Sequence, residues 1–92
     1  MTNPSANRDR AEAALAQLKV AVAAEVAVAG EDGMRNDEVA RTLGLETSVN
    51  GGQRNHLTHA LLNGLVEAGQ LHRDKRKTRV YYIHSDYVRK ST

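Results

Sequence analysis

The spacing of the apolar residues changes at Gly69. Before Gly69 apolar side chains recur every three or four positions, which is the period of an amphipathic helix. After Gly69 they recur every second position, which is the period of a strand. Helices followed by a strand pair predict an α+β fold that is mainly α, and a length of 92 residues is typical of one domain.

Three helices are predicted ahead of Gly69, behind a flexible tail over 1–6. The first covers 7–29, where Ala, the best helix former, is abundant. A short helix over 36–43 begins at Asn36, a good N-cap, and a longer helix covers 53–68. Leu62 and Val66 are expected on the outer side of this last helix. Its predicted inner face consists of Leu57, Ala60, Leu61, Gly64, Leu65 and Ala68.

A β-hairpin is predicted over 71–83, and 84–92 forms a C-terminal tail. The polar run Asp74–Lys77 is expected at the tip of the hairpin. Alternation places Val80 and Tyr82 on one face of the second strand and Arg79, Tyr81 and Ile83 on the other.

The charge is distributed unevenly along the chain. Residues 1–52 carry a net charge of −3 and residues 53–92 a net charge of +5, and five of the seven residues over 73–79 are basic. A one-sided basic field suggests a polyanionic partner, with nucleic acid first and an acidic membrane surface second. The alternative is a solvated hairpin that its charge keeps soluble.

Several classes of chemistry lack the residues they need. The chain has no cysteine, which excludes disulfides, thiolate zinc sites and thiol nucleophiles. His56 and His59 have a spacing that can hold zinc, but further ligands are not at hand, so we expect neither a metal nor a cofactor. Phosphate-loop, nucleophile-elbow and zinc-protease motifs are missing, which predicts a non-enzyme with no evident small-molecule ligand. No apolar run is long enough to span a membrane and no secretory signal is present, so a cytoplasmic location is expected.

Three segments, MRNDEVARTLGL, QRNHLTHALLNGLVEAGQL and HRDKRKTRVYYI, resemble the winged helix-turn-helix superfamily of DNA-binding proteins. The resemblance covers 34–83. It implies that 36–43 is a supporting helix, 53–68 a recognition helix and 71–83 a basic wing. The long connector Glu46–Gly52 is also similar, more weakly, to modules attached to bacterial restriction and other DNA-processing systems.

Under this resemblance three groups of side chains are candidates for DNA contact. The recognition helix must offer donors and acceptors to base edges from its first turns, and Asn55 and His59 are expected to do so. The wing supplies cations for phosphates or the minor groove, and the connector supplies hydroxyl and amide donors. Capping of the helix and solvation explain the same residue types without DNA. The candidates are Thr47, Ser48, Asn50, Gln53, Arg54, Asn55, His56, Thr58, His59, Arg73, Lys75, Arg76, Lys77 and Arg79.

The first helix suggests a second interaction. Nine of the ten residues over 20–29 are apolar, which predicts a homodimer through this helix. The sequence thus predicts a sequence-specific double-stranded DNA-binding protein, a small transcriptional regulator or accessory factor at the nucleoid. The alternative is a winged-helix module that docks another protein through its apolar first helix. A more distant possibility is binding to RNA or to an acidic membrane.

Overall fold

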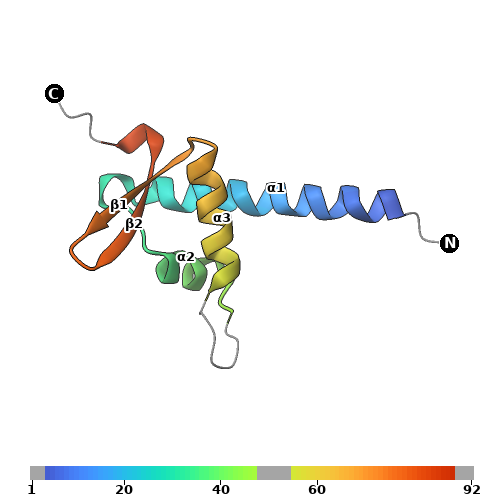
Figure 1. Cartoon of the computed structure of the whole chain (residues 1–92), viewed down its shortest axis with the longest axis horizontal. Helices are drawn as coiled ribbons and strands as arrows, with labels where there is room; N and C mark the ends of the chain where they lie inside the picture. Colours follow the sequence, from blue (N-terminus) through green and yellow to red (C-terminus); the bar gives the residue numbers. More distant parts are fainter. Residues whose placement is uncertain (1–3, 48–54, 89–92) are drawn as a thin grey trace.

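The computed structural model describes residues 4–47 and 55–88, and in this part of the chain three helices precede an antiparallel hairpin (Figure 1). The α+β, mainly helical prediction is confirmed at this level. Single 3-10 turns, η1 (Gly30–Asp32) and η2 (Ser85–Tyr87), follow the first helix and the second strand. The main elements are α1 (Pro4–Val28), α2 (Asn36–Leu43), α3 (His56–Glu67), β1 (Leu71–Arg76) and β2 (Arg79–His84).

Helix α1 begins at Pro4, so residues 4–6, predicted as part of a flexible tail, are helical. Proline suits the first position of a helix because its fixed φ is already helical and its missing N–H has no partner there. The two halves of α1 have different surroundings. Residues 7–17 are all exposed, and packing against the body starts at Leu18. Figure 1 shows the N-terminal half projecting from the body, and with it the chain measures 58 Å along its longest axis and 20 Å along its shortest.

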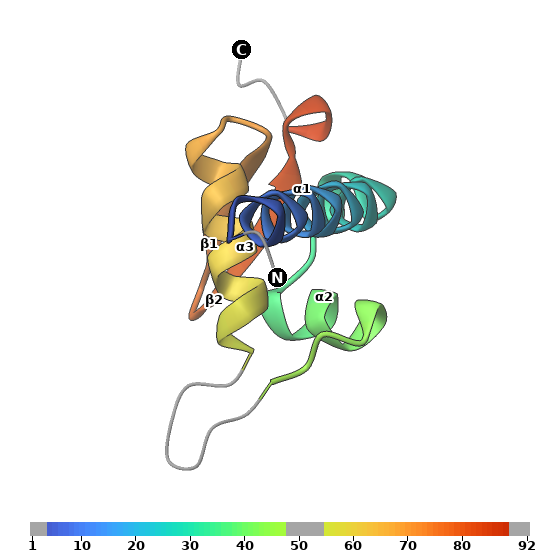
Figure 2. The same ribbon diagram turned by 90° about the vertical axis from the view of Figure 1, so that its right-hand side faces the viewer.

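The core lies where the C-terminal half of α1 meets α3, α2 and the hairpin. Figure 2 looks along α1 and shows α3 beside it and α2 below it. Gly64 of α3 lies under Lys19 of α1, where a Cβ would be 3.6 Å from Lys19 Cε. A Cβ at this distance would be in ordinary van der Waals contact with the lysine side chain, so the packing of α3 against α1 does not depend on a glycine at this position. The buried apolar residues are Val22, Ala23, Val26, Val39, Ala40, Leu61, Leu62, Leu65, Leu71, Tyr82 and Ile83.

The buried face of α3 is rotated from the predicted one. Leu62, expected on the outer side, is fully buried, and Val66 packs against the core as well. Leu57 is 36% exposed, and Ala60 and Ala68 are exposed although all three were predicted to face inward. The prediction missed this face because its first residue, Thr58, is polar. A search for apolar residues spaced three and four positions apart does not include a threonine. The buried positions of α3 are Thr58, Leu61, Leu62 and Leu65.

The hairpin turns at residues 77–78, three positions beyond the start of the predicted tip at Asp74. Asp74 pairs with Tyr81 inside the ladder, and Lys77 takes a positive φ of 56° that the tight turn requires. A short bridge that the sequence did not indicate adds Met34 to the far edge of β2. The Met34 N–H donates to Tyr82 O at 2.9 Å, and the Tyr82 N–H donates to Met34 O at 2.8 Å. The chain segment before α2 is thereby fixed to the hairpin.

Candidate nucleic-acid interface

The start of α3 is fixed to the start of α2 by Asn55. This residue precedes α3 in a left-handed conformation with φ of 56°, which Asn tolerates better than most residues. Its Oδ1 accepts from the Thr47 N–H at 2.9 Å, and its Nδ2 donates to Asp37 Oδ1 at 2.8 Å. Asn36 Nδ2 donates to the Asn55 carbonyl at 3.2 Å. The first turn of α3 therefore lies beside the first turn of α2.

Three predicted DNA contacts are wrong in this arrangement. Asn55 is only 5% exposed and its amide is used inside the protein, so it cannot reach a base edge. Thr58 is fully buried on the inner face of α3. The hydroxyl of Thr47 is buried, while its N–H and carbonyl bond to Asn55. The sequence could not separate these roles because the residues that cap and pin a helix start also hydrogen-bond to DNA.

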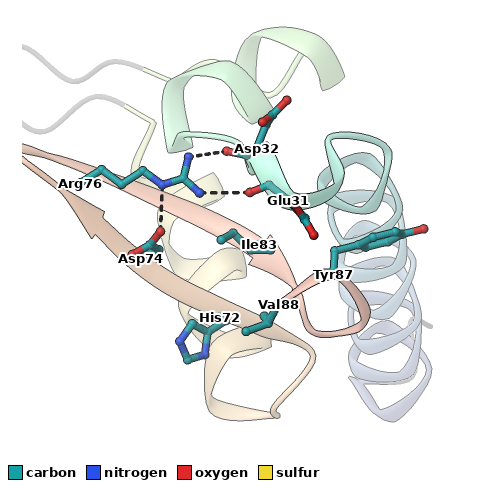
Figure 3. A pocket seen from close by; sticks show the side chains of 8 residues that line it. All are labelled: Glu31, Asp32, His72, Asp74, Arg76, Ile83, Tyr87 and Val88. Carbon is teal, nitrogen blue, oxygen red and sulfur yellow. Dashed lines mark hydrogen bonds and ion pairs between the residues drawn. The ribbon is translucent and has the colours of Figure 1, made fainter. Parts of the chain in front are cut away.

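Arg76, predicted as a wing cation for phosphates, is used within the fold instead (Figure 3). Its Nε donates to Asp74 Oδ2 at 2.8 Å, and its guanidinium donates to the carbonyl oxygens of Asp32 at 2.8 Å and Glu31 at 3.1 Å. The guanidinium carbon also lies 4.6 Å from the centre of the Tyr81 ring. Arg76 thereby ties the hairpin to η1 beside a hollow of about 440 Å³ that carries three carboxylates. A phosphate would be repelled from this side of the hairpin.

The opposite face of the hairpin carries Arg73, which is held in place by α3. Its guanidinium donates to Asn63 Oδ1 and lies 6.0 Å from the centre of the Tyr82 ring. Asn63 Nδ2 in turn lies 3.3 Å from His59 Nδ1. This row of three polar side chains crosses from α3 to β1. It limits the rotamers of Arg73 and leaves the residue exposed.

A cleft of about 340 Å³ lies between the start of α2, the exposed side of α3 and this face of the hairpin. Residues from the start of α2, from α3 and from the hairpin, which are distant in the sequence, therefore line one concave surface. We call it the arginine cleft, and its lining residues are Arg35, Asn36, Asp37, His59, Arg73, Arg79, Val80 and Tyr82.

The arginine cleft has an excess of positive charge. Asp37 is the single carboxylate that lines it, and Asn55 already donates to that carboxylate. Arg35 is partly neutralised by Glu38, whose Oε1 lies 3.2 Å from Arg35 Nε. Arg79 and Arg73 make no ion pair within the described part of the chain. An anion in the cleft would meet the Arg73 guanidinium and the amide dipoles at the start of α2, whereas Arg79, which also lines the cleft, pairs with Arg76 in the ladder.

The remaining predicted contacts fall into two groups. His56 is exposed at the first position of α3, and Lys75 and Lys77 are exposed along the hairpin and at its turn. The two lysines extend the basic surface from the arginine cleft towards the hairpin tip. The other predicted contacts, Ser48, Asn50, Gln53 and Arg54, lie outside the described residues.

Sequence reasoning missed Arg35 and Asn63. Arg35 precedes a predicted helix start, and a cation at that place was a usable signal for an anion-facing surface. Asn63 follows His59 by four positions, a spacing that makes the two side chains neighbours on a helix. No sequence signal relates Asn63 to Arg73, because that contact depends on how the hairpin folds against α3.

Over residues 4–47 and 55–88, no three His, Asp or Glu side chains gather as metal ligands would. In the same residues no helix is long and apolar enough to cross a bilayer. Comparisons with protein-family models, with curated proteins and with solved structures gave no match to this chain.

Proposed function

We propose that this protein binds double-stranded DNA through the arginine cleft, as a winged helix-turn-helix domain. The observation that carries the proposal is that Arg35, Arg73 and Arg79 line one concave surface together with His59 of α3. A phosphate backbone is the extended polyanion that matches such a row of guanidinium groups. In cells this activity would serve a small transcriptional regulator or an accessory DNA-binding factor.

The geometry favours different roles for the three elements around the arginine cleft. The cleft seats one stretch of phosphate backbone between α3 and the hairpin, with Arg73 as its principal partner. The outward side of α3, starting at His56, then enters the major groove. Lys75 and Lys77 reach phosphates further along the duplex. His59 is the described side chain best placed to meet a base edge, since Asn55 is buried.

The proposal is tested by a salt titration of affinity for duplex DNA, measured by fluorescence anisotropy. The cleft variant Arg73→Ala/Arg79→Ala should lower affinity for duplexes of any sequence. It should also reduce the slope of log affinity against log salt by about 0.9 for each lost phosphate contact. Arg8→Ala, on the exposed N-terminal half of α1, is the control. A cleft variant indistinguishable from Arg8→Ala would refute the proposal.

A second candidate function is supported by α1. Its N-terminal half is exposed over residues 7–17, and Val20 and Val28 are exposed further along. Such a helix suits a module that assembles with another protein, and winged-helix folds do not by themselves fix DNA as the ligand. Unchanged DNA affinity in every cleft variant would favour this function.

A further inference from the structure

The row of polar side chains formed by His59, Asn63 and Arg73 allows one orientation of its central amide. A guanidinium has N–H donors and no acceptor, so only the oxygen of the Asn63 amide can face Arg73. Oδ1 of Asn63 accepts from Arg73, which turns Nδ2 towards His59. The two nitrogens, Asn63 Nδ2 and His59 Nδ1, lie 3.3 Å apart. Because arginine stays charged, nothing at Arg73 favours the reverse orientation of the amide.

The orientation of Asn63 determines which ring nitrogen of His59 carries the proton. An amide Nδ2 only donates, so it needs a lone pair on His59 Nδ1. A proton on Nδ1 would bring two N–H groups together. A neutral imidazole has one proton, which is then on Nε2. Within the described part of the chain Nε2 makes no hydrogen bond, and His59 lines the arginine cleft. His59 therefore offers a partner a hydrogen-bond donor.

We propose that Asn63 positions His59 as a donor, and that His59 thereby selects guanine in the DNA that the protein binds. The inference rests on the proposed function, in which α3 enters the major groove. Guanine presents two acceptors there, N7 and O6, and no donor, whereas cytosine presents the donor N4 and adenine has a donor beside its N7. A donor at Nε2 thus favours guanine and disfavours cytosine. Asn63 does not line the cleft and acts through His59.

The position of the proton can be measured without DNA. In isotope-labelled protein at about pH 8.5, where imidazole is neutral, long-range proton–nitrogen NMR spectra report which ring nitrogen is protonated. In the parent we expect the proton of His59 on Nε2. Asn63→Asp keeps an acceptor for Arg73 but gives His59 an acceptor in place of a donor, so the proton should move to Nδ1. His72, exposed on the opposite face of β1, is the internal control and should not change.

A second variant removes the polar contact altogether. In Asn63→Leu the His59 proton should be shared between the two nitrogens, as it is in an exposed histidine such as His72. Circular dichroism checks that both variants keep the helix content of the parent. A proton on Nδ1 of His59 in the parent would overturn the proposal. So would an unchanged His59 spectrum in folded Asn63→Asp.

The choice of base is tested with duplex DNA. Selection of bound sequences from random duplexes, with the parent and with His59→Ala, identifies the base that His59 contacts. We expect guanine there for the parent and no preference for His59→Ala. At this position 7-deazaguanine lacks N7, and 6-thioguanine has sulfur, a weaker acceptor, in place of O6. One of these analogues should weaken binding of the parent about threefold to tenfold, which corresponds to one hydrogen bond, and leave His59→Ala unchanged.

The two measurements separate this inference from the proposed function. Asn63→Asp, assayed at about pH 8.5, should lose the preference for guanine because Nε2 no longer carries the proton. Cytosine at the position that depends on His59 would overturn the inference. An equal response of the parent and His59→Ala to both analogues would also overturn it, and would indicate a phosphate contact. A protein that binds no duplex would refute the proposed function and this role of His59 with it, whereas the nitrogen spectra test the proton position independently.

Discussion

Replacing Asn55 tests whether this residue holds the fold together or reads DNA. Asn55→Ala removes an acceptor for the Thr47 N–H, at about 1 kcal/mol, and a donor to the ionised Asp37 carboxylate, at about 2 kcal/mol. Alanine in the left-handed conformation adds roughly 1 kcal/mol. The expected loss in free energy of unfolding is therefore about 4 kcal/mol. A chain of this length has on the order of 5–14 kcal/mol in total.

The contribution of the backbone conformation can be separated with glycine. Asn55→Gly loses the same side-chain hydrogen bonds but adopts a positive φ freely, so it should be about 1 kcal/mol more stable than Asn55→Ala. Asn7→Ala, on the exposed half of α1, is the matched control and should stay within about 0.5 kcal/mol of the parent. Urea unfolding followed by far-UV circular dichroism measures all three variants.

One result would refute this reasoning. If Asn55→Ala unfolded at the same urea concentration as the parent but lost its preference among duplex sequences, Asn55 would be a base-reading residue. The buried network that joins it to Thr47 and Asp37 would then have no role in stability.

Two further predictions concern the segment between α1 and α2, which contacts the hairpin. Arg76→Ala should lower the free energy of unfolding by about 1–2 kcal/mol because it releases η1 from the hairpin, whereas Lys75→Ala should have little effect; thermal unfolding compares the two. An equal effect of both variants would contradict a structural role for Arg76. Gly33→Ala should cost about 3 kcal/mol, since its φ is 72° and a Cβ would meet Tyr82 O at 2.8 Å. Gly30→Ala, also at positive φ but in open space, should cost about 1 kcal/mol, and equal losses by urea unfolding would argue against the close contact.

The local elements could be predicted from the sequence because their signals are local. Apolar spacing, Ala content and the change of period at Gly69 located three helices and a hairpin close to where the structure has them. The alternation in β2 also assigned Val80 and Tyr82 to one face, which the strand register confirms. The basic hairpin was visible as a run of cations, since charge and strand period are properties of the chain itself.

Tertiary structure alone decided which polar side chains are available to a partner. Asn55 and Thr58 resemble contact residues in the sequence, but the packing of α3 against α2 and α1 buries both. Arg73 and Arg76 differ by three positions in one strand and therefore lie on opposite faces of the hairpin. Arg73 lines the arginine cleft, whereas Arg76 donates hydrogen bonds to the carbonyl oxygens of η1. The sequence determines the period of each element, but the rotation of a helix and the sides of a hairpin depend on contacts between residues distant in the chain. Those contacts set which charges remain exposed.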